Sequence, residues 1–190
     1  MNYIVAALLL LCSFGTRAGE PCEELADTAI GAALGDTDAT YRLAVEFFTG
    51  QCLHQDYANA ALLWERVVAA TGDVSATNNL GYLLSEGKGV PRDEVRAVEL
   101  WSDAARRGHA EAQFHLGSAL FNGYGVAKDQ ARGLAWVMSA ADTAVKLPQV
   151  GGGPEVEATA RAEMTRMIAA GPGLEASALA LVGSLGILRR

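Results

Sequence analysis

Residues 76–105 read ATNNLGYLLSEGKGVPRDEVRAVELWSDAA, and residues 112–141 read AQFHLGSALFNGYGVAKDQARGLAWVMSAA. The two stretches agree at a constant offset of 36 residues, which brings a Leu-Gly pair, a Gly-x-Gly-Val turn and a final Ala-Ala into register. A less regular copy precedes them at an offset of 37, where six residues align: Ala39, Leu43, Gly50, Asp56, Ala60 and Trp64 match Ala76, Leu80, Gly87, Asp93, Ala97 and Trp101. A fixed period of this length is typical of a chain that stacks one supersecondary unit.

Each unit has the pattern of two helices joined by a tight turn. Apolar or small side chains share one face of the first helix: Ala76, Leu80, Gly81 and Leu84. The Gly-x-Gly segment allows the chain to reverse, Pro91 prevents the helix from continuing, and Asp93 is a suitable N-cap for the second helix. The second helix is expected to bury Ala97, Leu100, Trp101, Ala104 and Ala105. Gly81 and Gly117 cost about 1 kcal/mol each relative to alanine in mid-helix, so we expect a neighbouring helix to approach closely there.

The repeated pattern resembles the Sel-1-like repeat, a relative of the tetratricopeptide repeat. The resemblance implies an all-α fold, a right-handed helical-repeat solenoid of helix-turn-helix units, with three repeats over residues 38–144. The first repeat is degenerate: Ala44 replaces the mid-helix glycine, Cys52-Leu53 replace Gly-Val, and Val67-Val68 replace Ala-Ala. We therefore expect the turn of the first repeat to be remodelled.

A solenoid also needs terminal capping helices, because an end repeat has an apolar face without a neighbour. Residues 19–37 are expected to form an N-terminal cap helix, and residues 145–153, which end in three glycines, are expected to form a linker. Residues 154–190 are expected to form C-terminal capping helices that are interrupted at residues 171–173. The last of them, over residues 174–188, has an apolar face and is shorter than the roughly 20 residues of a membrane span.

The N-terminus resembles a cleaved secretory signal. An apolar run over residues 4–11 precedes small residues suited to cleavage after Ala18, so residues 1–18 predict a signal peptide and a periplasmic or secreted protein. The pattern departs from such signals because no Lys or Arg precedes the run and because Arg17 lies near the cleavage site. The alternatives are an apolar helix retained on a cytoplasmic protein and a lipid anchor on Cys12. The run is too short for stable membrane insertion.

Removal of the signal leaves two cysteines, Cys22 and Cys52. In an exported protein such a pair predicts a structural disulfide, which would join the N-terminal cap to the degenerate repeat. The competing interpretation is a metal site formed with His54. These three residues lack the spacing of known zinc motifs, so we expect no metal.

The composition excludes some partners and gives little support for catalysis. The chain has 15 Lys plus Arg against 22 Asp plus Glu, a formal charge of -7, which is the wrong sign for binding nucleic acid. Ser85 and Lys88 fit the Ser-x-x-Lys signature of penicillin-recognising enzymes, but the other elements of that signature are missing. The three histidines, His54, His109 and His115, are expected to have no carboxylate at ligand spacing. We therefore expect no catalytic residue and no cofactor.

The surface of the first helices is the expected binding site. In folds of this kind the first helices line a concave groove. Aromatic, amide and basic side chains lie opposite the buried face, and they suit a protein or peptide partner. The predicted groove residues are Tyr41, Arg42, Phe48, Asn78, Asn79, Tyr82, Phe114, His115 and Phe121. The alternative is that the aromatic members of this set only pack against adjacent helices.

These features predict a periplasmic or secreted repeat scaffold that binds a protein or a peptide. The resemblance implies an adaptor or regulator of the bacterial envelope. Two alternatives remain open: a hydrolase of cell-wall or β-lactam compounds, and a neutraliser of an effector that targets the envelope.

Overall fold

The computed structural model describes Cys22 and residues 24–182. The predicted signal peptide lies outside the described residues, and so does the chain from residue 183 onward. Regular structure in the described part is entirely helical. The helices are α2 (Leu25–Leu34), α3 (Thr37–Thr49), α4 (Tyr57–Thr71), α5 (Val74–Glu86), α6 (Glu94–Arg106), α7 (Ala110–Asn122), α8 (Gln130–Lys146), α9 (Pro154–Ala169) and α10 (Leu174–Val182).

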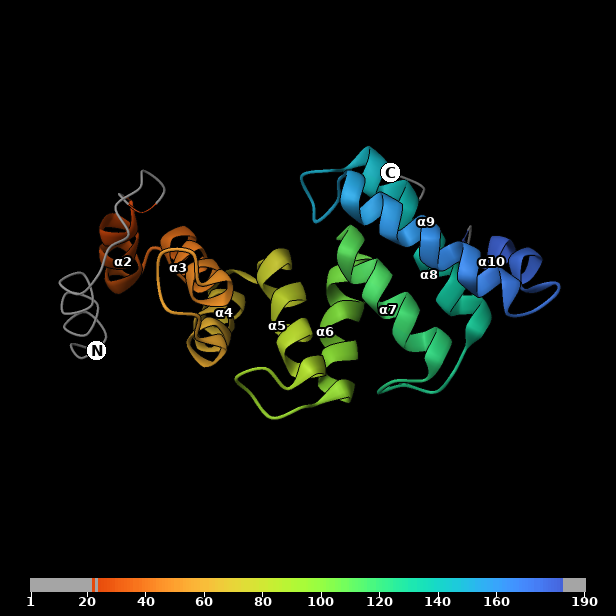
Figure 1. Ribbon diagram of the computed structural model, residues 1–190, viewed down its shortest axis with the longest axis horizontal. Helices are drawn as coiled ribbons and strands as arrows, with labels where there is room; N and C mark the ends of the chain where they lie inside the picture. Colours follow the sequence, from red (N-terminus) through yellow and green to blue (C-terminus); the bar gives the residue numbers. More distant parts are fainter. Residues whose placement is uncertain (1–21, 23, 183–190) are drawn as a thin grey trace.

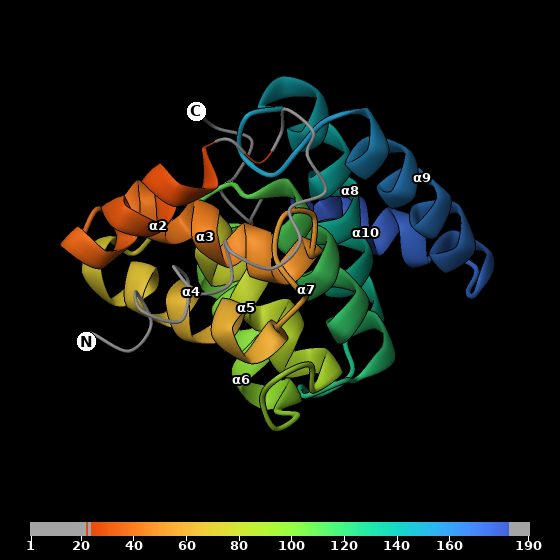
Figure 2. The same cartoon turned by 60° about the vertical axis from the view of Figure 1, so that its left-hand side comes forward.

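From α2 to α9 each helix contacts the next one along the chain, and Figures 1 and 2 show the stack from two sides. Three helix-turn-helix units are formed by α3 with α4, α5 with α6, and α7 with α8. Contacts of α4 with α5 and of α6 with α7 join each unit to the next, α2 packs on α3 at one end, and α9 and α10 pack on α8 at the other. The predicted all-α helical-repeat solenoid is confirmed.

The end of the first helix and the start of the second are built alike in every unit. Each first helix ends at a glycine with positive φ: 72° at Gly50, 67° at Gly87 and 85° at Gly123. Each second helix follows an aspartate whose side chain accepts a hydrogen bond from the first helical turn: Asp56, Asp93 and Asp129. The backbone N–H of this aspartate donates back to the first helix at 2.8 to 2.9 Å in all three units: from Asp56 to Phe47, from Asp93 to Leu84 and from Asp129 to Leu120. The two ends of the turn are therefore built in the same way in the degenerate unit.

The second glycine of the turn packs against the preceding unit. A β-carbon at Gly89 would lie 2.8 Å from the Cα of Ala58, at the start of α4. A β-carbon at Gly125 would lie 2.9 Å from the Cβ of Glu94, at the start of α6, and closer still to its carbonyl group. The turn of one unit is thus in backbone contact with the second helix of the unit before it.

In the first unit a disulfide takes the place of this contact. Cys52 stands where the later units have the second glycine, and it is bonded to Cys22 with the two Cα atoms 5.5 Å apart, which confirms the predicted disulfide. Positive φ occurs only at glycines among the described residues, so Cys52 lacks the left-handed conformation of Gly89 (φ 70°) and the turn is remodelled at this residue. A bond that spans 30 residues of sequence contributes about 2 to 4 kcal/mol by constraining the unfolded chain.

The mid-helix glycines mark close helix contacts, as predicted. A β-carbon at Gly81 would lie 2.7 Å from Nε1 of Trp101, and one at Gly117 would lie 2.7 Å from the carbonyl oxygen of Gly133. Trp101 is 7% exposed. All the second-helix residues that were predicted to be buried lie in the core: Ala97, Leu100, Trp101, Ala104 and Ala105.

The last two helices cover the apolar face of the third unit. Met167 of α9 and Ala178 of α10 are fully buried and share a core cluster with Val137 of α8. α8 runs to Lys146 and so includes the first two residues of the predicted linker, and the described part of the last helix ends at Val182. The assignment of these helices as caps stays a prediction. None of the helices in the described ranges has both the length and the apolar character of a membrane span.

Candidate functional site

Seven of the predicted groove residues form a surface that solvent reaches. We call it the first-helix surface, and it consists of Tyr41, Arg42, Phe48, Asn79, Tyr82, Phe114 and His115. They lie on α3, α5 and α7, which are the first helices of the three units. Arg42 is exposed and the other six residues are half-buried. Their role in binding stays a prediction.

Two predicted groove residues lie in the interior, which corrects their predicted exposure. Asn78 is 2% exposed and Phe121 is 4% exposed. The backbone carbonyl of Asn78 accepts a hydrogen bond from the indole of Trp101 at 3.3 Å, so this side of α5 faces α6. Phe121 belongs to the core cluster that α9 and α10 complete, with the guanidinium of Arg166 5.5 Å from its ring centroid. Neither side chain is available to a partner.

A chain of hydrogen bonds crosses from the first unit to the third. The side-chain amide of Asn79 donates to the hydroxyl of Tyr41 at 3.4 Å. The side-chain amide of Asn78 donates to Oδ1 of Asn79 at 3.3 Å and to Oε2 of Glu111 at 3.0 Å. One residue comes from α3, two from α5 and one from α7. This polar network links the three first helices to one another.

Glu111 lies in this region and was not among the predicted groove residues. Its Oε1 atom lies 3.9 Å from Nε2 of His115, one helical turn further along α7. The expectation that the histidines have no carboxylate at ligand spacing was therefore wrong for His115, and the i,i+4 spacing was the available signal. His115, together with Asn78, lowers the pKa of the Glu111 carboxyl more than burial raises it. Glu111 is consequently an anion at neutral pH.

Aromatic rings form a row beside the polar network. His115 stacks on Trp101, with ring centroids 4.8 Å apart and planes inclined by 19°, and its centroid lies 6.3 Å from that of Tyr82. The ring of Tyr82 lies 6.0 Å from Phe48 in an edge-to-face arrangement. The ammonium group of Lys88 donates to the Tyr82 hydroxyl at 2.6 Å, which raises the pKa of Lys88. Tyrosine is among the residue types enriched at the few positions that dominate binding energy in protein interfaces.

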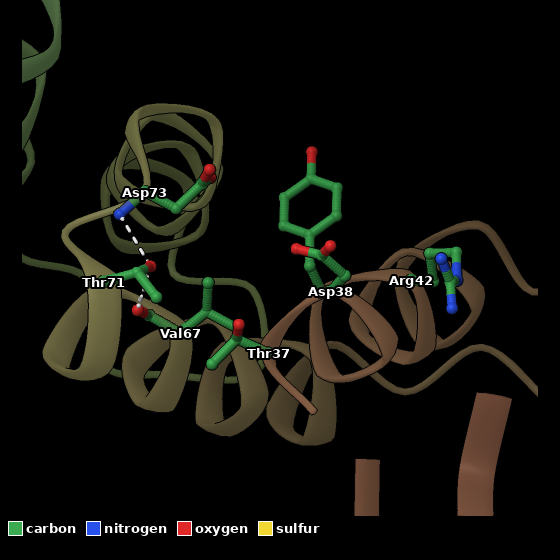
Figure 3. Close-up of a pocket in the computed structure, with 7 residues that line it drawn as sticks. Thr37, Asp38, Arg42, Val67, Thr71 and Asp73 are labelled. Carbon is green, nitrogen blue, oxygen red and sulfur yellow. Dashed lines mark hydrogen bonds between the residues drawn. The ribbon is translucent and has the colours of Figure 1, made fainter. Parts of the chain in front are cut away.

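Three hollows adjoin the first-helix surface. Figure 3 shows one of about 310 Å³, with Asp38 and Arg42 of α3 on one side and Asp73 on the other. A second, of about 300 Å³, lies between α2 and α3 and also includes Arg42. A third, of about 330 Å³, lies among α5, α6 and α7, with Trp101 and His115 in its wall. Each is at the small end of the range for small-molecule sites, and this size suits a single side chain of a partner.

The residues of the Ser-x-x-Lys match are engaged in structural hydrogen bonds. The hydroxyl of Ser85 donates to the backbone carbonyl of Tyr82 at 2.9 Å, and the ammonium of Lys88 donates to the Tyr82 hydroxyl. Gly87 ends α5 between them, so the two residues do not share a helical turn. In the part of the chain that the structure describes, no group of three or more His, Cys, Asp and Glu side chains is placed to hold a metal ion.

His109 is the N-cap of α7, at the position where the two earlier first helices have Asp36 and Asp73. Its Nδ1 atom accepts a hydrogen bond from the first turn of α7 at 3.3 Å, and the residue is 1% exposed. The predicted linker covers this helix end, because the carbonyl groups of Val150 and Gly151 accept the next backbone N–H groups of the helix. Burial lowers the pKa of His109.

We expect the folded protein to lose stability as the pH falls below about 6.5, the ordinary pKa of histidine. The pKa of His109 is lower in the folded state, so the unfolded chain binds the proton first, and a protonated Nδ1 no longer accepts the capping hydrogen bond. The loss approaches about 1.4 kcal/mol per pH unit between the two pKa values. Denaturant unfolding from about pH 5 to about pH 8 measures this slope.

His109→Asn is the control for this pH dependence, because asparagine keeps a capping acceptor and does not titrate. We expect the variant to have a flatter profile over this range. The neighbouring Glu111 also has a lowered pKa, and its contribution is lost only as the pH falls below the ordinary range of a carboxyl. Equal slopes in the two proteins would show that His109 is not the titrating group.

The sequence matches one family. The pattern of the Sel1 repeat matches residues 37–66, 74–109 and 110–142, which together make up just over half of the chain. The three matched segments begin at or beside the first residues of α3, α5 and α7. No curated protein sequence matches the chain significantly.

The fold is similar to solved structures. A Sel1 repeat protein from Oxalobacter formigenes is 27% identical with a TM-score of 0.58, and the similarity covers 75% of this chain and 98% of that protein. A protective antigen present in uropathogenic Escherichia coli strains, which displays an SLR fold, is 24% identical with a TM-score of 0.58. That similarity covers 80% of this chain and 40% of the antigen, and it concerns the fold alone.

Proposed function

This chain belongs to the Sel1 repeat family, and we propose that it is an exported scaffold that binds a protein or peptide partner through the first-helix surface. Sel1 repeat folds generally mediate protein–protein interaction, and members of the family are typically non-catalytic. In this proposal the chain acts as an adaptor or regulator in the cell envelope and carries out no reaction of its own.

The observation that carries the proposal is the row of half-buried rings beside a polar network that crosses all three units. Tyr82 is at its centre, with Phe48 on one side and His115 on the other. Packing between neighbouring side chains holds these rings in place before a partner arrives, so little conformational entropy is lost on binding. Aromatic side chains beside ordered amides and an exposed arginine form the kind of surface that provides binding hot spots.

Export is supported by the disulfide between Cys22 and Cys52, because structural disulfides persist in oxidising compartments. The pattern of residues 1–18 supports the same location. Mass spectrometry of the native protein is expected to find an N-terminus at Gly19 in the periplasmic or secreted fraction. An intact Met1 in the cytoplasmic fraction would contradict export.

We expect that single substitutions on the first-helix surface weaken partner binding while the fold is kept. The partner would first be isolated from envelope extract by pull-down with the purified chain and identified by mass spectrometry. Tyr82→Ala, Arg42→Ala and Phe114→Ala should then each weaken its affinity by at least about 1 kcal/mol, or about fivefold, with nearly unchanged helix content and a smaller loss of Tm than a core substitution causes.

Val95→Ala is the matched control, since Val95 is 59% exposed on α6, which is a second helix. Its affinity and Tm should equal those of the wild type. If all three surface substitutions lower Tm as much as a core substitution does, these side chains serve the core. If they leave the affinity unchanged, the partner binds to another face.

A further inference from the structure

Glu111 presents a fixed carboxylate beside the first-helix surface. Its Oε2 atom is held by the amide of Asn78 at 3.0 Å, and Asn78 is itself buried and shared with Asn79. Its Oε1 atom lies 3.9 Å from His115, which is beyond hydrogen-bond distance. The side chain is 45% exposed. A carboxylate accepts about four hydrogen bonds, so Glu111, which Asn78 orients and which also faces His115, keeps most of its acceptor capacity for a partner.

The surroundings of Glu111 suit a long cationic side chain. Phe114 and His115 follow it on the same side of α7, and their rings are 5.5 Å apart. The centroid of the Tyr82 ring lies 6.3 Å from that of His115. The faces of such rings attract ammonium and guanidinium groups, and their edges pack against the methylene stem of lysine or arginine.

The hollows next to the first-helix surface are lined by acidic side chains as well. Four carboxylates line the two hollows beside α3: Glu24, Asp38, Glu46 and Asp73. Arg42 is the cation that lines both hollows, and Figure 3 shows it on the same helix as Asp38. Two further cations lie near the aromatic row: Lys88 donates to the hydroxyl of Tyr82, and Arg92, which lines the third hollow with His115, forms an ion pair with Glu94. The chain as a whole carries a formal charge of -7. This field favours the approach of a positively charged segment.

We infer that Glu111 is the anchor for a lysine or arginine side chain of the partner, and that the partner segment carries net positive charge. The inference rests on the proposed function, because it specifies which kind of segment the first-helix surface binds. The ammonium or guanidinium group donates to Oε1 of Glu111, and its stem lies along Phe114 and His115.

Phage-displayed random dodecapeptides selected on the full chain test this inference. We expect the selected peptides to contain at least about twice the lysine and arginine of the unselected library. The affinity of the best peptide, made synthetically, should fall about tenfold for Glu111→Gln, which corresponds to one charge-assisted hydrogen bond. Added salt should weaken the wild type more than the variant.

Glu65→Gln is the matched control, because Glu65 is exposed on α4, a second helix. A substitution in the peptide does not depend on the stability of any protein variant. If the anchoring residue of the selected peptide is an arginine, replacing it by citrulline should cause the same tenfold loss of affinity for the wild-type chain. Neutral or acidic selected peptides would overturn the inference and leave the proposed function standing. Basic peptides that bind Glu111→Gln as tightly as they bind the wild type would also overturn the inference and leave the proposed function standing. A chain that selects no peptide would overturn both the inference and a peptide-binding role.

Discussion

Replacing Trp101 with alanine is expected to lower the free energy of unfolding by about 3 to 5 kcal/mol. Trp101 is 7% exposed, and its ring fills the space that Gly81 leaves open on α5. Its indole N–H donates to the carbonyl of Asn78, and its face supports the ring of His115. The substitution therefore leaves a cavity between the second and third units and removes a buried hydrogen bond. Urea unfolding monitored by circular dichroism measures the loss.

A control on the same helix separates this effect from any general weakness of α6. Val95→Ala changes an exposed apolar residue and should shift the free energy of unfolding by no more than about 0.5 kcal/mol. Should Trp101→Ala prove as mild as this control, the packing of α6 on α5 is not a main source of stability. A loss of binding by Trp101→Ala alone would not identify a contact residue, because its effect on the fold reaches His115.

The features of the fold that repeat in the sequence are the ones that sequence analysis predicts. The glycines at 81 and 117 have a physical cost in a helix, so their recurrence indicated a close helix contact, and each does face a neighbouring helix. The aspartate caps and the turn glycines depend on local backbone geometry. Such local features are visible wherever the residue types that they require recur at the same position.

The errors concern residues whose environment depends on more than one neighbouring helix. A helical wheel divides a first helix into one buried side and one open side. In the structure α5 packs against both α4 and α6. Asn78 of α5 also donates a hydrogen bond to Glu111 on α7. That third contact buries Asn78 on a side expected to be open. Phe121 is buried in a core cluster that also contains residues of α8, α9 and α10. Position in the repeat therefore does not by itself predict which side chains are buried.

Glu111 illustrates the opposite case, a site residue that no repeat position indicated. Its hydrogen bond joins it to a residue 33 positions earlier, and only the stacking of units brings the two together. The i,i+4 spacing to His115 was visible in the sequence. Spacing alone does not show that the carboxylate is fixed by a buried amide, and this orientation is what distinguishes Glu111 from the exposed glutamates of the second helices.

Gly125→Ala is expected to lower the free energy of unfolding by about 2 to 5 kcal/mol, because two costs combine. Gly125 has φ of 64°, a conformation that disfavours a side chain by about 1 to 2 kcal/mol. The new β-carbon would also overlap the backbone of Glu94, where the turn of the third unit touches the second helix of the unit before. Denaturant unfolding of the variant measures the sum.

Gly108→Ala isolates the first of these costs. Gly108 has φ of 89°, and a β-carbon there would have no neighbour within 4 Å, so its loss should be only about 1 to 2 kcal/mol. The difference between the two variants reports the contact between units. Similar losses of unfolding free energy in the two variants would show that the backbone around Glu94 shifts at little cost to make room for the new β-carbon. The turns would then contribute little to the coupling of one unit to the next. A clear difference would explain why the first unit, which has Cys52 at the equivalent position, is joined to the preceding helix by a covalent bond instead.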